Sequence, residues 1–251
     1  MASFFQNFPK VYYRFGDAEK AVIFNNLTVY IDLIDQLKSQ VEFYQKYTIL
    51  DGDRPDVLSQ KLYDTPDYHW TFFLMNDGLR ESGWPLSERE MRALVKKRYP
   101  HRTVTTQSNI ASNFLPGDFV IGKTSGTTGR VVERNLDLGQ IVIASDKNDA
   151  GLNNNFGQTE QIAAGTTAEE QNANTATLIS ESQQFNAPLY YKNSSGDIVD
   201  IDPYNQTTSG LVPTTIMEDN INFNDRLKEI IVIKPSRIIS VVSEYFKLLK
   251  A

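Results

Sequence analysis

Two short strand-forming segments of this sequence lie far apart, and neither has a strand next to it along the chain. Residues 47–50 read Tyr-Thr-Ile-Leu, and residues 227–233 form a β-branched run that stops before Pro235. Helices are expected on both sides of the first segment, and a loop before the second. Buried backbone groups without partners are costly, so each segment needs another strand. We therefore predict that they pair with each other, which makes their domain discontinuous.

A tight turn follows the first of these segments. Gly52 permits a sharp exit from the strand, and either Asp51 or Asp53 is placed to bond a freed backbone N–H group or Arg54. Pro55 then suits the first turn of a short helix, because its missing N–H has no partner there in any helix.

The apolar content rises after a break at residues 64–67. A second, almost wholly apolar helix runs from there to Asn76, and a helix without a polar face is a buried one. We expect Trp70, with Phe73 and Leu74, to fill the core of a small strand–helix–helix–strand domain.

Both ends of the chain carry candidates for contact with a partner. The N-terminal segment is rich in aromatic side chains, which pack either on the protein's own core or on a neighbouring subunit. A helix is expected next, over residues 28–39, and an amphipathic helix over residues 236–249 closes the chain. The candidate residues at the two ends are Phe4, Phe5, Phe8, Tyr12, Tyr13, Tyr245, Leu248 and Leu249.

The middle of the chain has a different character. A third helix is expected from about Ser87 to Arg98, and strand and turn signals dominate from residue 103 onward. Residues 145–184 contain a single aromatic residue among Asn, Gln, Ala, Thr and Ser, so we interpret them as mostly loop. The expected strands are a hairpin over 114–134 that joins 140–143 in a small β module, and a short hairpin of 189–192 with 198–201.

One motif resembles a phosphate-binding loop. Residues 117–124, Gly-Asp-Phe-Val-Ile-Gly-Lys-Thr, match its G-x-x-x-x-G-K-[ST] pattern. Such a loop works because flexible, Gly-rich backbone points N–H groups at phosphate and a helix begins at the lysine. Here the spacer is β-branched and aromatic, and turn residues follow Lys123. The motif therefore indicates a strand, a turn and a second strand.

Composition excludes several classes of function. A net charge of −6 and a pI near 5.1 argue against nucleic acid and against an anionic membrane as partners. No apolar run approaches the roughly 18–20 residues that span a bilayer, and no signal-peptide pattern opens the chain, so we expect synthesis in a cytoplasm. The chain has no cysteine and two histidines, His69 and His101, and nothing in it indicates an enzyme, a cofactor or a metal site.

Four segments of the chain carry a resemblance to known proteins. They are NFPKVYYRF (7–15), YTILDGDRPDVLSQKLYDTPDYHWTFFLMND (47–77), YYKNSSGDIVDID (190–202) and NDRLKEIIVIKPSRIISVVSEYF (224–246). The order of strand, DGDRP turn, helix, break and helix ending in Asn76 is similar to the front of a LysM βααβ unit, whose closing strand would be residues 227–233. Together the four segments resemble one protein family, the LysM-like baseplate wedge proteins of contractile-tailed bacteriophages.

The resemblance implies an α+β fold with a discontinuous LysM-like βααβ core, a largely β and loop insertion, an N-terminal aromatic arm and a C-terminal amphipathic helix. The corresponding domain map is 1–45 for the arm and first helix, 46–102 for the first part of the LysM-like domain with its trailing helix, 103–223 for the insertion, 224–235 for the closing strand and 236–251 for the last helix.

The resemblance also implies a structural role in the virion rather than catalysis. The expected partners are other phage baseplate wedge proteins, including those of neighbouring wedges in a six-fold assembly, and no cofactor or small-molecule substrate is expected. The alternative is a module that binds peptidoglycan glycan in the groove beside residues 51–55, as many LysM modules do. A large insertion and terminal arms suit a scaffold for protein contacts better than a sugar module.

Overall fold

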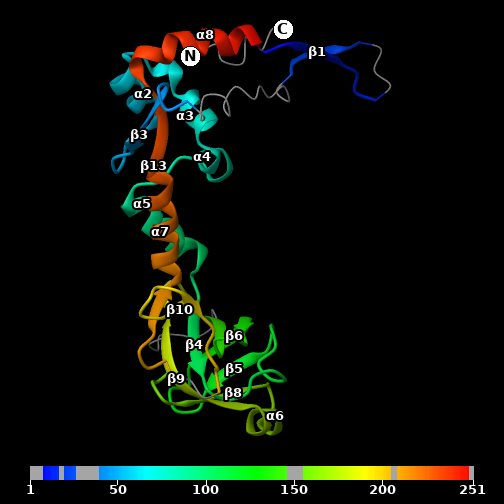
Figure 1. Ribbon diagram of the computed structural model, residues 1–251. Coiled ribbons are helices and arrows are strands. Elements are labelled where there is room, and N and C mark those ends of the chain that lie inside the picture. Colours follow the sequence, from blue (N-terminus) through cyan, green and yellow to red (C-terminus); the bar gives the residue numbers. More distant parts are fainter. Residues whose placement is uncertain (1–7, 17–19, 27–39, 146–154, 205–207, 249–251) are drawn as a thin grey trace. The chain divides into compact units, whose positions relative to one another are not determined.

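The protein has an α+β fold that divides into two compact units (Figure 1). The computed structural model describes residues 8–16, 20–26, 40–145, 155–204 and 208–248. Unit 1 consists of Met1–Glu88 with Phe223–Ala251, and unit 2 consists of Arg89–Asn222. Unit 1 is therefore discontinuous in sequence, as the two isolated strand segments predict. The helix expected over 28–39 lies outside the described residues.

The described elements divide between the two units, and within each unit they are named in chain order. Those of unit 1 are β1 (Lys10–Tyr13), β2 (Val22–Asn25), β3 (Tyr44–Thr48), α2 (Pro55–Tyr63), η2 (Pro66–Tyr68), α3 (Trp70–Met75), α4 (Asp77–Ser82), β13 (Glu229–Ile233), η4 (Pro235–Arg237) and α8 (Ile238–Leu248). Those of unit 2 are β4 (Arg102–Thr106), β5 (Phe119–Gly122), β6 (Thr128–Asn135), β7 (Gln140–Ser145), β8 (Gln161–Ala164), α6 (Ala168–Ala173), β9 (Thr175–Gln183), η3 (Gln184–Asn186), β10 (Pro188–Lys192), β11 (Ile198–Val199) and β12 (Val212–Thr215). The boundaries between the units fall at the start of α5 (Glu88–Arg98) and within α7 (Ile216–Lys228).

The predicted pairing of the two distant strands in unit 1 is confirmed. Strands β3 and β13 form an antiparallel two-stranded sheet in which Thr48 lies opposite Glu229 and Tyr44 opposite Ile233. Strand β3 begins and ends earlier than expected, because residues 49–50 already lead into the turn. The backbone N–H of Ile49 still donates to the Lys228 carbonyl at 2.9 Å.

The core of unit 1 forms where this sheet meets its helices. Trp70 is buried there, as expected, and its ring lies 5.3 Å from that of Tyr245 on α8. Phe73 and Leu74, also expected in the core, are only partly buried against it. The remaining buried core residues are Phe8, Ile49, Leu58, Tyr63, Phe72, Met75, Leu79, Ile230, Val232, Ile233, Ile238, Val241 and Val242.

Two asparagines tie the halves of this discontinuous unit together. Asn76 Oδ1 accepts from the Ile231 N–H and its Nδ2 donates to the Ile231 carbonyl, each at 2.8 Å. Asn224 Oδ1 likewise accepts from the Leu86 N–H, and its Nδ2 donates to the Leu86 carbonyl, each at 2.9 Å. An Asn side chain carries one donor group and one acceptor, so it can satisfy both backbone groups of a residue as a neighbouring strand would. The front of the unit is thereby fixed to residues more than a hundred positions later.

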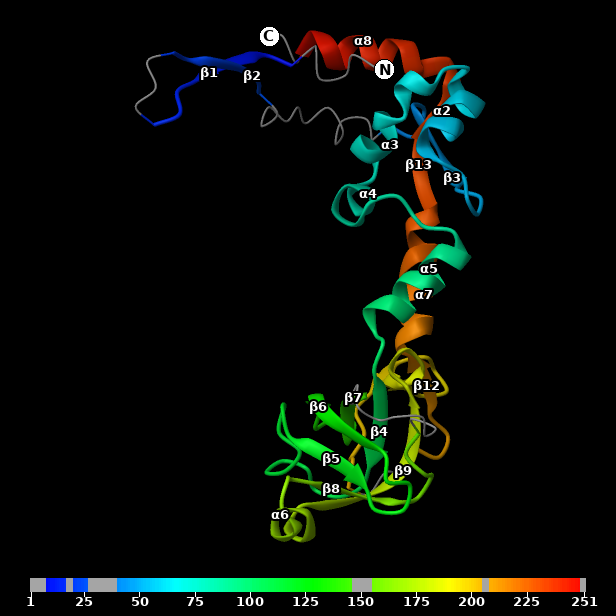
Figure 2. The ribbon, with the colours of Figure 1, turned by 180° about the vertical axis from the view of Figure 1, so that it is seen from behind.

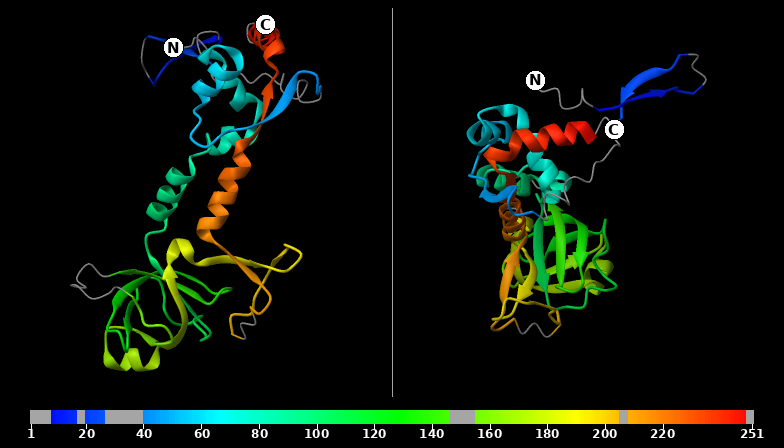
Figure 3. Two further views of the ribbon diagram at one scale, coloured as in Figure 1. Left: turned by 90° about the vertical axis from the view of Figure 1, so that its left-hand side faces the viewer. Right: turned by 45° about the horizontal axis from the view of Figure 1, so that its top comes forward.

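Unit 2 is built around a closed barrel (Figure 3). Its six strands are antiparallel and follow the order β4-β7-β6-β5-β8-β9. Side chains fill its interior, and alternate residues of each strand point inward. The buried residues are Val104, Ile110, Phe114, Val120, Val131, Ile141, Ile143, Phe156, Ile162, Ala164, Ala176 and Leu178.

The barrel corrects the interpretation of residues 145–184 as mostly loop. Strands β8 and β9 lie in this stretch and close the barrel by pairing with β5 and β4. The stretch contributes small buried residues to the barrel interior, such as Ala164 and Ala176. Low apolar content therefore hid a region that is integral to the core of unit 2.

Two of the hairpins expected in unit 2 are confirmed. The phosphate-loop pattern lies on β5 and the following turn, and β5 pairs with β6 so that Val120 lies opposite Gly129. The backbone N–H of Lys123 donates to the Gln161 carbonyl at 2.9 Å, which places this lysine in the barrel wall instead of at the start of a helix. Strand β10 pairs with β11 as expected, and also with β12. The helix α7 was not expected.

Candidate interaction surface

A two-stranded hairpin near the N-terminus of unit 1 carries large exposed apolar side chains on both of its strands. Strands β1 and β2 lie side by side (Figure 2). They pair antiparallel, with Val11 opposite Phe24 and Tyr13 opposite Val22. Beyond the strands, the backbone N–H of Asn26 donates to the Pro9 carbonyl at 2.7 Å. The register is thus set by backbone pairing, and it sorts the side chains onto two faces.

One face of the hairpin is almost wholly apolar. Successive side chains of a strand alternate between faces, so cross-strand partners share one. The ring of Phe15 lies 5.0 Å from that of Tyr13 and 5.7 Å from that of Phe24, measured between centroids. We call this group the aromatic face, and it consists of Val11, Tyr13, Phe15, Val22 and Phe24.

Every large apolar side chain of the hairpin is exposed. The exposed fraction is 56% for Tyr13 and 59% for Phe15 on the aromatic face, and 71% for Tyr12 on the other. An isolated two-stranded hairpin is at best marginally stable in water, and burying one such side chain contributes roughly 1.5–3 kcal/mol. A contiguous apolar surface of this kind is typical of a site of contact with another protein.

The N-terminal candidates divide into three groups. Tyr12 and Tyr13 lie on β1 and belong to the exposed hairpin. Phe8 is instead buried in the core of unit 1, which leaves little of its side chain for a partner. It immediately precedes the hairpin and anchors the base of this segment in the unit's own core. Phe4 and Phe5 lie outside the described residues.

The C-terminal candidates are likewise separated. Tyr245 is a core residue: it is buried, and its ring centroid lies 5.3 Å from that of Trp70 and 5.7 Å from that of Phe246. The helix α8 packs on its own unit through this side. Leu248 is 40% exposed, and Leu249 lies outside the described residues.

The aspartates of the DGDRP turn form hydrogen bonds with other residues of unit 1. Asp51 Oδ1 accepts from the Glu88 backbone N–H at 2.9 Å, and Asp53 Oδ1 accepts from Lys61 Nζ at 2.7 Å. The Asp53 carbonyl accepts from the Trp84 indole at 2.6 Å. The expectation that an aspartate bonds a backbone N–H is confirmed for Asp51, although the N–H belongs to a later helix.

The remaining turn residues behave differently from one another. Arg54 does not pair with either turn aspartate and instead lies 3.0 Å from Asp56 in an exposed ion pair. Gly52 has a φ of +81°, a value that L side chains rarely adopt, which confirms the need for glycine at the exit of the strand. Pro55 opens α2 as expected.

A lysine at the end of α7 adds an electrostatic tie to this turn. Lys228 Nζ lies 2.8 Å from Asp225 and 3.4 Å from Asp51. The hydrogen bond to Asp225, and then that to Asp51, raises the pKa of Lys228 above its ordinary value. The turn and the closing segment of unit 1 are therefore linked by charge as well as by pairing of β3 with β13.

Sequence reasoning missed half of the hairpin. Val22, Ile23 and Phe24 form β2, yet only the aromatic residues of the first strand stood out as candidates. The signal was present, because Gly16 and Asp17 separate two short β-branched or aromatic runs in the manner of a hairpin turn. High aromatic density drew attention to the first run alone.

No protein-family model matches the chain, and no curated protein matches it at a significant level. Within the part of the chain that the structure describes, no helix is long and apolar enough to cross a bilayer. The same residues contain no group of three or more His, Asp or Glu side chains placed to hold a metal ion. Its function is therefore inferred from its own residues and their arrangement.

Proposed function

We propose that the protein is a structural component of a contractile phage tail baseplate, a LysM-like wedge protein that contacts other wedge subunits and helps join adjacent wedges. The finer fold assignment belongs to this proposal: β3, α2, α3 and β13 would form a discontinuous βααβ unit of the LysM kind. The resemblance of residues 47–77 and 224–246 to that family supports it. These two segments lie in one unit, and their strands pair.

The exposed aromatic face of the β1–β2 hairpin is the observation that carries a role in assembly. It belongs to residues 10–25, which include most of the segment 7–15 that resembles the family. A sheet face that its own protein leaves uncovered gains most from contact with an apolar surface of another protein. We commit to a neighbouring wedge protein as the occupant, because wedge proteins are the partners that the resemblance implies.

The proposal is tested by co-expression with the neighbouring tail gene products, followed by affinity purification of this chain. We expect the wild-type protein to retain at least one wedge protein. Changing Val11→Ser together with Phe24→Ser removes two cross-strand partners from the aromatic face, and such central apolar contacts contribute roughly 2 kcal/mol or more each to binding. The double variant should therefore lose most of the retained partner.

A matched control changes two other exposed apolar strand residues. Ile198→Ser with Val212→Ser alters the small sheet of unit 2, where both side chains are at least 60% exposed. This control should retain the partner at the wild-type level. Retention by the aromatic-face variant as well would show that the hairpin is not the docking surface. If the wild-type protein retains no tail protein at all, the baseplate role itself is refuted.

A further inference from the structure

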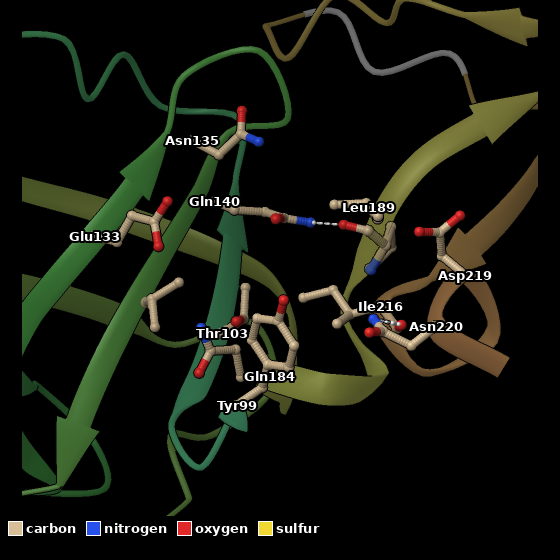
Figure 4. A pocket seen from close by; sticks show the side chains of 12 residues that line it. Tyr99, Thr103, Glu133, Asn135, Gln140, Gln184, Leu189, Ile216, Asp219 and Asn220 are labelled. Atoms are coloured by element: carbon tan, nitrogen blue, oxygen red, sulfur yellow. Dashed lines mark hydrogen bonds between the residues drawn. The ribbon is translucent and has the colours of Figure 1, made fainter. Parts of the chain in front are cut away.

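A second site lies in unit 2, in a cleft of about 380 Å³ between the outer face of the barrel and the layer formed by β10 and α7 (Figure 4). It is separate from the hairpin and does not depend on the baseplate proposal. The volume corresponds to roughly a dozen water molecules at about 30 Å³ each. A cleft of this size falls within the range typical of small-ligand sites.

Strand alternation explains why polar side chains line the barrel side of this cleft. Val104 and Ile141 point into the barrel, so Thr103 and Gln140, their neighbours on β4 and β7, point outward. An outward residue is normally solvated, but β10 and α7 cover this patch. Thr103 is only 2% exposed, and Gln140 and Gln184 are also buried. The fold has therefore buried polar groups at a place where it also leaves space.

These three buried side chains retain unused hydrogen-bonding capacity. Thr103 Oγ1 has no hydrogen-bond partner among the described residues. The amide of Gln140 donates to the Pro188 carbonyl at 2.9 Å, and that of Gln184 accepts from the His101 N–H at 3.3 Å. Each amide has a donor end and an acceptor end, so one end of each makes no bond within the described protein.

For the Thr103 hydroxyl this is unfavourable, because a buried donor or acceptor without a partner loses its full hydration. The Thr103 hydroxyl both donates and accepts, Gln140 Oε1 accepts and Gln184 Nε2 donates. A ligand that satisfies all three must itself offer donors and acceptors close together. Hydroxyl groups do this, since each one donates and accepts.

The charge of the cleft narrows the ligand further. No Lys or Arg is among the residues that line it, which argues against phosphate or carboxylate ligands. Of the two lining carboxylates, Glu133 lies at an exposed position and Asp219 already accepts from the Tyr190 hydroxyl at 2.9 Å. The buried floor is thus neutral. The half-buried ring of Tyr99 and the side chain of Ile216 add apolar surface for a C–H face (Figure 4).

We propose that this cleft binds one neutral sugar unit, with ring hydroxyls on Thr103, Gln140 and Gln184 and the apolar face of the ring toward Tyr99. A pyranose with its hydroxyls matches the volume, the neutrality and the mixture of donors and acceptors. The site differs from the groove beside residues 51–55, where Asp51 Oδ1 and Asp53 Oδ1 accept hydrogen bonds within unit 1 and Asp53 Oδ2 is buried without a partner among the described residues.

The test uses the full chain and saturation-transfer NMR with the methyl glycosides of glucose, galactose and N-acetylglucosamine. We expect at least one glycoside to receive saturation on its ring protons. Thr103→Val keeps the shape of the side chain and removes its hydroxyl, so the protein should fold at least as stably while affinity falls about tenfold or more. Thr103→Ser keeps the hydroxyl and should restore most of the binding.

Thr105→Val is the matched control, because it makes the same change two residues along β4 at a position that does not line the cleft. Its affinity should equal that of the wild type. Failure of every glycoside to receive saturation at tens of millimolar would overturn the proposal. So would undiminished affinity in Thr103→Val. Binding of an amine instead of a sugar, with loss in Glu133→Gln and sensitivity to salt, would show that the cleft takes a cation and would also overturn it.

Discussion

Among the residues that the structure describes, unit 1 has two antiparallel sheets of two strands each, and only one of them has buried apolar side chains. In the β3–β13 sheet, Ile230, Val232 and Ile233 are buried beneath helices. In the β1–β2 sheet, every residue of β1 is exposed, and so are all the apolar residues of β2. Both sheets are rich in aromatic and β-branched side chains, so local strand propensity does not explain the difference.

The two sheets differ in the sequence separation between their paired strands. The strands of the covered sheet come from opposite ends of the sequence, and Asn76 and Asn224 fix the halves of that unit to each other. The uncovered sheet is assembled from residues close together in sequence, and among the described residues next to it Phe8 lies in the core. A locally formed sheet without long-range cover leaves its burial energy to be gained on contact with another molecule.

The largest expected effect is a difference in backbone protection. Amides of β3 and β13 should exchange with solvent only by unfolding of unit 1, which for domains of this kind requires roughly 5–15 kcal/mol. Amides of residues 10–13 and 22–25 should open at close to no cost in the free protein. Hydrogen exchange followed by mass spectrometry measures both. Equal protection in the two sheets, independent of protein concentration, would mean that the hairpin is covered within the monomer.

An aspartate introduced into each sheet should lower the free energy of unfolding by very different amounts. Val232→Asp places a carboxylate in the core of unit 1 without a partner and should lower its free energy of unfolding by at least about 4 kcal/mol. Ile23→Asp makes a comparable change on the exposed hairpin and should alter that free energy by no more than about 0.5 kcal/mol. Denaturant unfolding at constant pH provides both values. A large loss in Ile23→Asp would show that the hairpin contributes to the fold of the unit.

The sequence predicted the covered sheet well because its pattern is strong. The β-branched run that became β13 has few alternatives to a strand, and Asn76 was correctly placed at the end of the second helix. Strand β3 begins at Tyr44, earlier than predicted, because the polar residues Gln45 and Lys46 do not by themselves indicate a strand. They fit a strand once the sheet is known to have a face toward solvent. Its side chains became interpretable only with β13 as the known partner.

Other elements lacked a local signal. Helix α7 contains Asn220, Asn222 and Asn224, which have low helix propensity, and its stability comes from tertiary contacts such as that of Asn224 with Leu86. Strands β8 and β9 contribute small alanines to the barrel interior and therefore read as polar loop. The cleft of unit 2 could not be predicted from the sequence either. No motif marks its lining residues Thr103, Gln140 and Gln184, and only closure of the barrel brings them together.

A smaller loss in the free energy of unfolding is expected on removing the Asn76 side chain, which bonds to strand β13 of the covered sheet. Asn76→Ala removes both hydrogen bonds to Ile231 and the one to the Phe72 carbonyl, and it leaves backbone groups of a half-buried strand residue without those partners. We expect a loss of about 2–3 kcal/mol in the free energy of unfolding. Asn25→Ala is the control in the uncovered sheet, where the change should stay within about 0.5 kcal/mol. Similar losses in both variants would contradict a special role for Asn76.

The smallest expected effect comes from a hydroxyl beneath the covered sheet. The Tyr63 hydroxyl donates to the Ile233 carbonyl at 2.9 Å, and burial raises the pKa of Tyr63 above its ordinary value. Because the folded pKa exceeds the unfolded one, its contribution is complete below about pH 10 and is lost as pH rises through the folded pKa. Tyr63→Phe should therefore cost about 1 kcal/mol at neutral pH and unfold with a weaker alkaline dependence than the wild type. Tyr12→Phe removes the same hydroxyl from the uncovered sheet and should leave stability at neutral pH within about 0.5 kcal/mol of wild type. Identical alkaline profiles for wild type and Tyr63→Phe would show that this hydroxyl does not couple the helix α2 to β13.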